Sequence, residues 1–141
     1  MTQEEKDFLI RDLCARLPYG VKCISGADDA TLIIEGINPS CCGASEIQVT
    51  YERSGINFDT TISAIKPYLF PLSSITEEQI NELSKLDVSY GDYALHDSVF
   101  GLGISVDEAY IFFEFCYKHH IDFLGLIDLG LAIDATGLNI Y

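Results

Sequence analysis

Residues 21–37 read VKCISGADDATLIIEGI and residues 47–60 read IQVTYERSGINFDT, and these two stretches decide the fold. β-Branched residues fill segments 21–25 and 31–37, and the GADD between them has the composition of a hairpin turn. Apolar and polar residues alternate over 47–52, which is typical of a strand with one face in water. A turn at 53–55 leads into a fourth strand near 56–60. We therefore expect a small antiparallel meander of three to four strands with one face covered.

A helix is predicted before these strands. Thr2 and Glu5 have the spacing of a capping box, and Pro18 and Gly20 mark the end of the helix. The apolar residues expected on its buried face are Phe8, Leu9, Leu13, Cys14 and Leu17. The charged residues expected mostly on its other faces are Lys6, Arg11, Asp12 and Arg16.

The second half of the chain changes from irregular to helical. Pro67 and Pro71 restrict residues 62–71 to turns or short helical pieces. Thr76 and Gln79 form a second capping box that opens a helix, and residues 87–103, rich in Gly, Asp and Tyr, are expected to be a loop that carries function. Ser105 and Glu108 form a third capping box, which opens a helix that ends near residue 119.

The third helix is apolar nearly all round, so we expect it to be the main core helix. Beyond it, residues 122–129 predict a short helical turn ending at Gly130, followed by an extended segment at 131–134. With no repeat or linker in the sequence, residues 1–141 are predicted to form a single α+β domain. Its small antiparallel sheet is expected to be covered by about three helices.

Composition favours a packed, cytoplasmic protein. The chain has 141 residues, 48 % of them hydrophobic and 21 % charged, which is ordinary globular usage. Its first residues are polar and acidic, unlike an export signal, and its longest apolar stretches are too short to cross a bilayer. The five cysteines are odd in number and irregularly spaced, so we expect reduced thiols.

The net charge of −14 bears on the choice of partners. Binding to nucleic acid or to an anionic membrane draws on Lys and Arg, so this charge disfavours both. An acidic surface could instead imitate DNA and occupy a basic groove of a DNA-binding protein. Such mimicry requires acids concentrated on one face, whereas here they are spread evenly along the chain. Solubility is the plainer interpretation of the charge.

Three histidines, His96, His119 and His120, are the weak candidates for metal ligands. Neighbouring residues on a helix point about 100° apart, so His119 and His120 cannot easily reach one ion. At a helix C-terminus, histidines also interact favourably with the helix dipole. We therefore expect a capping role, no metal and no cofactor.

Four aromatic residues in irregular segments suggest a binding patch. They are Tyr68, Phe70, Tyr90 and Tyr93. No spacing of Ser, Cys, His and acidic residues fixes a nucleophile beside a base, so the catalytic residues are unknown and the sequence favours binding over an enzymatic role.

Three stretches carry a resemblance. Residues 7–22 read DFLIRDLCARLPYGVK, residues 65–74 read IKPYLFPLSS before TEEQ at 76–79, and HHIDF at 119–123 is followed by GLI and GLA. These stretches resemble a family of short uncharacterised proteins encoded in gut anaerobe genomes and in their prophages and other mobile elements. The resemblance brings no activity, cofactor or catalytic residue with it. It implies a cytoplasmic bacterial or phage accessory protein that acts by binding.

The leading functional hypothesis is an accessory protein-protein interaction module. The alternative is a small enzyme or ligand-binding domain with its site near the loop at 87–103. The second alternative is an acidic DNA mimic that inhibits a DNA-binding protein. The expected partner is another protein, and a homodimer stays open because an exposed sheet edge invites pairing.

Overall fold

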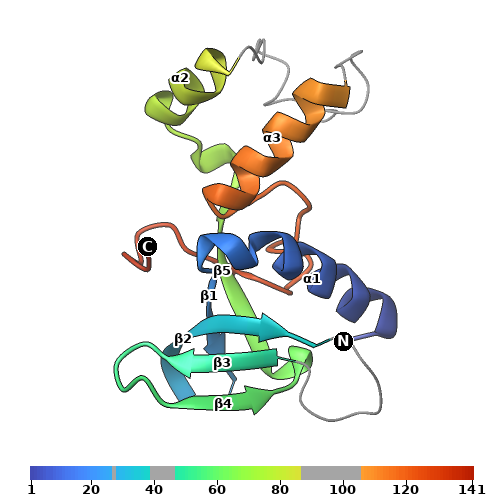
Figure 1. The fold of residues 1–141 in the computed structure, drawn as a ribbon, viewed down its shortest axis with the longest axis vertical. Helices are drawn as coiled ribbons and strands as arrows, with labels where there is room; N and C mark the ends of the chain where they lie inside the picture. Colours follow the sequence, from blue (N-terminus) through green and yellow to red (C-terminus); the bar gives the residue numbers. More distant parts are fainter. Residues whose placement is uncertain (27, 39–46, 87–105) are drawn as a thin grey trace.

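The computed structural model describes residues 1–26, 28–38, 47–86 and 106–141, and within them the chain forms three α-helices and one seven-stranded mixed sheet (Figure 1). Strands β1 (Lys22–Ser25), β2 (Asp28–Ile37), β3 (Ile47–Tyr51) and β4 (Asn57–Thr60) form an antiparallel meander. The full order is β4-β3-β2-β1-β5-β6, with β7 also paired to β5. The α+β class is confirmed, but the prediction of a three- to four-stranded antiparallel sheet is wrong.

The sheet is larger than predicted because residues 65–71 form a strand despite their two prolines. Strand β5 (Ile65–Pro71) pairs antiparallel with β1, then parallel with β7 (Ile133–Asp134) and β6 (Ile121–Asp122). Gly26 N–H donates to Ala64 O at 2.9 Å. In an antiparallel ladder, hydrogen-bonded residue pairs alternate with pairs that share no hydrogen bond. Pro67 is opposite Cys23, three pairs along from the hydrogen-bonded pair of Gly26 and Ala64, so it belongs to a pair without hydrogen bonds. No N–H toward β1 is needed there. Pro67 is therefore compatible with this strand.

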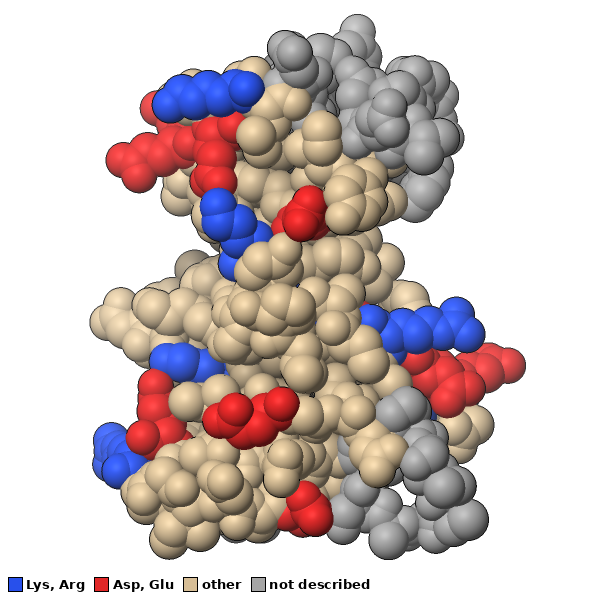
Figure 2. All heavy atoms as spheres, in the orientation of Figure 1, with Lys and Arg blue, Asp and Glu red and all other residues tan. Residues whose placement is uncertain are grey.

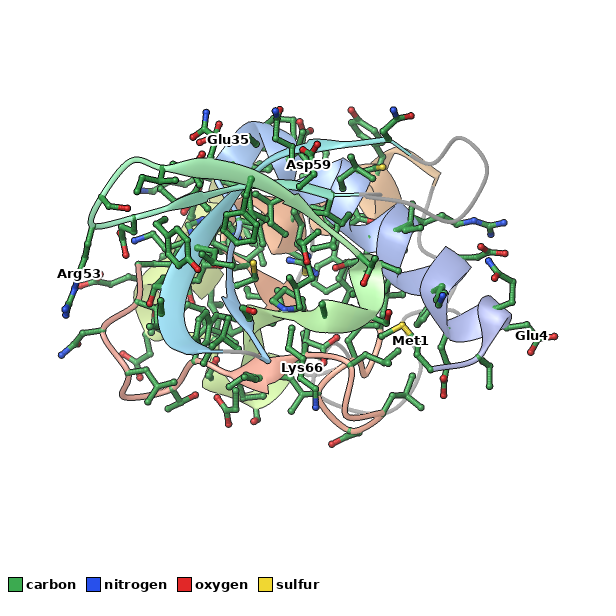
Figure 3. All side chains as sticks on the ribbon, turned by 90° about the horizontal axis from the view of Figure 1, so that it is seen from below. Met1, Glu4, Glu35, Arg53, Asp59 and Lys66 are labelled. Atoms are coloured by element: carbon green, nitrogen blue, oxygen red, sulfur yellow. The ribbon has the colours of Figure 1, made fainter. Side chains whose placement is uncertain are left out.

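One apolar cluster, which we call the sheet cluster, fills the space between α1 (Gln3–Arg16) and the sheet. Its buried members are Leu9, Leu13, Val21, Cys23, Leu32, Ile34, Ile47, Val49, Ile62, Ile65, Leu69, Leu126, Leu131 and Ala132. The capping box of α1 is confirmed, since Thr2 Oγ1 accepts from Glu5 N and Glu5 Oε2 accepts from Thr2 N. On the opposite face of the sheet, Glu35 of β2 and Asp59 of β4 project into solvent, and Arg53 projects from the turn between β3 and β4 (Figure 3).

Two short 3₁₀ turns connect these elements. Turn η1 (Leu17–Tyr19) follows α1 and ends at Gly20, whose φ of 72° suits glycine, and η2 (Ile62–Ala64) precedes β5. A third, η3 (Leu72–Ser74), leads from β5 into α2 (Glu77–Lys85). The capping box predicted for α2 is confirmed. The box predicted at residues 105 and 108 lies outside the described side chains.

A second and smaller cluster lies between α2 and α3 (Val106–Lys118), beyond the end of the sheet (Figure 1). This helix-pair cluster has the buried members Leu83, Phe112, Phe115, Cys116 and Ile121. Of the three helices, α1 alone contributes buried residues to the sheet cluster. The expectation that about three helices cover the sheet, with the third as main core helix, is therefore wrong.

Arg16 connects the two clusters and is fully buried. Its Nε and Nη2 donate to Asp12 at 2.7 and 2.9 Å, Nη1 donates to Cys116 O at 3.2 Å, and Nη2 also donates to Ile121 O at 2.9 Å. Burial raises the pKa of Asp12, and the Arg16 guanidinium opposes this effect. The helical pattern had placed both charges away from the core and Cys14 toward it, whereas Cys14 is exposed.

The predicted turn after β6 is held by a buried carboxylate. Asp122 Oδ1 accepts from Leu126 N at 2.9 Å and Oδ2 accepts from Ile127 N at 2.8 Å. The turn closes at Gly130, whose φ is 71°. This segment carries Leu126 into the sheet cluster. In the described part of the chain, every helix is too short or too polar to cross a membrane.

Candidate functional site

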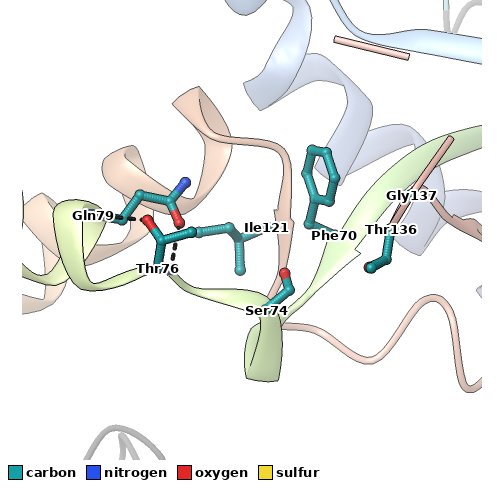
Figure 4. A pocket seen from close by; sticks show the side chains of 7 residues that line it. All are labelled: Phe70, Ser74, Thr76, Gln79, Ile121, Thr136 and Gly137. Atoms are coloured by element: carbon teal, nitrogen blue, oxygen red, sulfur yellow. Dashed lines mark hydrogen bonds between the residues drawn. The ribbon is translucent and has the colours of Figure 1, made fainter. Parts of the chain in front are cut away.

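A cavity of about 250 Å³ lies between the start of α2 and the segment that follows β7 (Figure 4). Its described lining residues are Phe70, Ser74, Thr76, Gln79, Ile121, Thr136 and Gly137. All of them are uncharged. The described lining therefore offers shape and hydrogen bonds, but no acid, base or thiol for catalysis.

Most polar groups of this lining already have local partners. Ser74 Oγ donates to Pro71 O at 2.7 Å, and Thr76 Oγ1 accepts from Gln79 N at 3.2 Å. Gln79 Oε1 in turn accepts from Thr76 N at 2.9 Å. Within the described residues, this arrangement leaves the Gln79 side-chain amide nitrogen as a donor at the cavity. The capping box thus fixes the orientation of the one amide that a bound group would meet.

Phe70 links the cavity to an arrangement that we call the Tyr141 anchor, made by Phe70, His120, Tyr141, Lys22 and Tyr68. The Tyr141 ring stacks on His120 with centroids 3.9 Å apart and planes 11° apart, and the Phe70 centroid lies 5.9 Å from it. The Tyr141 hydroxyl donates to Tyr68 O at 2.9 Å and accepts from Lys22 N at 3.1 Å. Two predicted site residues, Phe70 and His120, thus meet through Tyr141, which sequence reasoning missed.

His120 has an unusual environment for a histidine. Its φ is 55°, it is only 6 % exposed, and its Nδ1 has no hydrogen-bond partner in the described structure. Burial, together with the charge of Arg16, lowers the pKa of His120 to about 4, against hydrogen bonding to the Tyr19 backbone. The ring is therefore neutral at pH 7. The expected interaction of a charged His120 with the helix dipole is wrong, and its left-handed backbone ends α3 instead.

His119 points to a different partner from His120. His119 Nε2 lies 3.0 Å from Glu82 Oε2, and Lys118 Nζ lies 2.8 Å from Glu82 Oε1. The hydrogen bond from Lys118, followed by the charge of His119, lowers the pKa of Glu82. The two histidines therefore do not converge on one point. The described residues contain no group of three or more His, Cys, Asp or Glu that could hold a metal ion.

The other predicted site residues are placed as follows. Tyr68 is buried, with its carbonyl oxygen bound by Tyr141, so its ring does not contribute to an exposed patch. Tyr90, Tyr93 and His96 lie outside the described residues, as does the alternative site at 87–103. Of the two aromatic candidates that the structure describes, Phe70 is the one that lines the cavity.

The described thiols do not suit nucleophilic chemistry in the core. Burial raises the pKa of Cys23 and of Cys116 to about 12, so both thiols stay protonated at pH 7. Cys14 is exposed on α1. Cys41 and Cys42 lie outside the described residues.

No protein-family model, no curated protein and no solved structure matches the chain. The cavity and the Tyr141 anchor are therefore the features on which a functional proposal rests.

Proposed function

We propose that this chain is a bacterial or phage accessory protein of the cytoplasm that binds another protein, and that an uncharged side chain of the partner enters the cavity. The observation that carries this proposal is the uncharged lining, with Phe70 and Ile121 as apolar walls and Gln79 as a donor. Small-molecule pockets usually measure about 300–1,000 Å³, so a cavity of about 250 Å³ suits one inserted side chain better than a cofactor.

The net charge bears on the kind of partner proposed, and the free thiols bear on the compartment. The net charge of −14 disfavours a partner with an acidic rim around its inserted side chain. Among the described cysteines, Cys14, Cys23 and Cys116 are unpaired, as is usual in a reducing compartment. On the face drawn in Figure 2, the described carboxylates form separate groups, several beside Lys or Arg, rather than one continuous stripe. That distribution favours cavity binding over DNA mimicry.

The test compares a substitution that fills the cavity with the same substitution at an exposed position outside it. Thr136 and Ser73 are both exposed, but only Thr136 lines the cavity, so Thr136→Trp is the blocking variant and Ser73→Trp its control. The tagged full chain and both variants would be used to capture partners from a bacterial lysate at low and high salt, after circular dichroism has shown equal folding. We expect one stoichiometric protein with the wild type and with Ser73→Trp at both salts, and its loss with Thr136→Trp.

Two outcomes would contradict the proposal. Equal capture by Thr136→Trp would place the interface elsewhere. A partner lost from the wild type at high salt would indicate the acidic surface, because salt screens charge contacts much more than apolar ones.

A further inference from the structure

The last described residues form one wall of the cavity. We call residues 135–141 the strap. It begins where Ala135 N donates to Leu69 O at 2.8 Å, and its next two residues, Thr136 and Gly137, line the cavity (Figure 4). From residue 136 to residue 139 the strap is exposed. The strap is therefore an exposed segment that is attached to the rest of the molecule at both of its ends.

The second point of attachment is the Tyr141 anchor. Besides its stacking and hydroxyl bonds, Lys22 Nζ donates to Ile140 O at 2.6 Å and lies 5.8 Å from the Tyr141 ring centroid. Tyr141 as a whole is 44 % exposed, but desolvation at its hydroxyl raises the pKa to about 12, so the hydroxyl keeps its proton and donates to the Tyr68 carbonyl at neutral pH. Ring, hydroxyl and preceding carbonyl are all held at this end.

Between its two ends the strap is lightly held. Leu138 N donates to Ala135 O at 3.1 Å and Thr136 N donates to Asp134 Oδ1 at 2.8 Å, and both are local turns at the first end. Asn139 has a φ of 49°, a left-handed conformation that a residue other than glycine adopts uncommonly, whereas the φ of 76° at Gly137 suits glycine. In the described structure, the hydrogen bonds of residues 135–138 therefore all belong to the first end, and residues 140 and 141 supply the second attachment.

We propose that the strap is a latch on the cavity: docking of Tyr141 against His120 holds Thr136 and Gly137 in the wall, and release of Tyr141 opens the cavity and uncovers Phe70. This inference rests on the proposed function for the role of the cavity. The latch itself is a property of the chain alone, so it can be tested without a partner. Loss of partner binding in Thr136→Trp and failure of the latch are therefore separate results.

The experiment is amide hydrogen exchange of the full chain by NMR, with Tyr141→Ala, Tyr141→Phe and the control Leu138→Ala, whose side chain is 49 % exposed in the same strap. In Tyr141→Ala we expect the Thr136 and Leu138 amides to exchange roughly tenfold faster or more, with β2 and β3 unchanged. Tyr141→Phe keeps the ring and loses two hydrogen bonds, so a smaller acceleration is expected. Leu138→Ala should match the wild type.

A second readout follows the imidazole. In Tyr141→Ala the ring that covers His120 is removed, so the pKa of His120 should rise toward the ordinary histidine value. Unchanged Thr136 and Leu138 exchange in Tyr141→Ala would overturn the latch. Faster exchange throughout β2 and β3 in both Tyr141 variants would also overturn it, because Tyr141 would then be part of the core.

Discussion

The sheet cluster and the helix-pair cluster are built on different principles. The sheet cluster is mostly aliphatic and is enclosed by ladders of backbone hydrogen bonds between strands that follow one another along the chain. The helix-pair cluster is smaller and rich in aromatic rings, and its two helices are linked at the surface by Glu82 with Lys118 and His119. The comparison teaches that the smaller region depends on its connection to the larger one, which is made by Arg16 together with the pairing of β6 with β5.

The largest expected effect breaks that connection. Arg16→Met leaves the Asp12 carboxylate buried without its partner and frees the carbonyl oxygens of Cys116 and Ile121. Removal of one member of a buried pair typically costs about 3–5 kcal/mol of unfolding free energy. Urea denaturation followed by circular dichroism measures the loss. The matched control is Asp12→Leu with Arg16→Met, which should be less destabilised than Arg16→Met alone. Equal losses would show that the carbonyl contacts, rather than the unpaired charge, dominate.

The next effect separates the clusters. Leu83 is fully buried in the helix-pair cluster, and Leu83→Ala should lower the unfolding free energy by about 3 kcal/mol through the cavity that it leaves. Amide exchange should accelerate in α3 more than in β2 and β3. A uniform acceleration in both regions would mean that the two clusters unfold as one unit, and the distinction between them would fail.

An intermediate effect concerns pH at the boundary between the clusters. The pKa of folded His120, about 4, lies below the ordinary value of about 6.5, so between these values the unfolded chain binds more protons. His120 therefore leaves stability unaffected at high pH and costs about 2 kcal/mol as the pH falls from about 7 to about 5. Urea unfolding at several pH values measures this slope. In His120→Gln that part of the slope should be absent, and an unchanged slope would assign it to carboxylates.

The smallest effect is at the surface link of the helix pair. Glu82→Gln removes the charge that Lys118 and His119 contact, and because Glu82 is partly exposed the expected loss is about 0.5 kcal/mol. Because the pKa of Glu82 is lowered in the folded chain, its contribution to the unfolding free energy is present at neutral pH and is lost as the pH falls through that pKa. Thermal unfolding at low and high salt measures it. A loss of several kcal/mol would make the link as important as Arg16.

Local signals predicted the fold well where the structure is local. The meander β1–β4 and the capping boxes of α1 and α2 follow from alternation, turn residues and N-cap chemistry over a few neighbouring positions. Strand β5 was missed because its partners β6 and β7 lie far along the chain. In addition, a proline argues against a strand unless it is known that its position in the ladder needs no N–H donor, and the sequence alone does not show this for Pro67.

The site was predicted only in part, for a related reason. Phe70 was singled out because an aromatic residue in an irregular segment is a fair candidate for an interface. The pairing of Asp12 with Arg16 looks like a surface pair at four-residue spacing, since the pattern does not show that α3 covers it. Tyr141 gave one signal, a large aromatic side chain at the end of the segment ATGLNIY, which has no other aromatic residue. Its partner was set by tertiary packing.

The arrangement of β5 also has a consequence for biosynthesis. Phe70 pairs with Ile121 and Tyr68 with Ile133, so the second half of β5 cannot be completed until those late residues have left the ribosome. Chains emerge at about 5–20 residues per second, which is slow compared with hairpin formation. The meander therefore has time to form first, while half of β5 waits with its backbone groups unpaired. The nascent chain therefore exposes this part of β5 until residues 121–134 have left the ribosome.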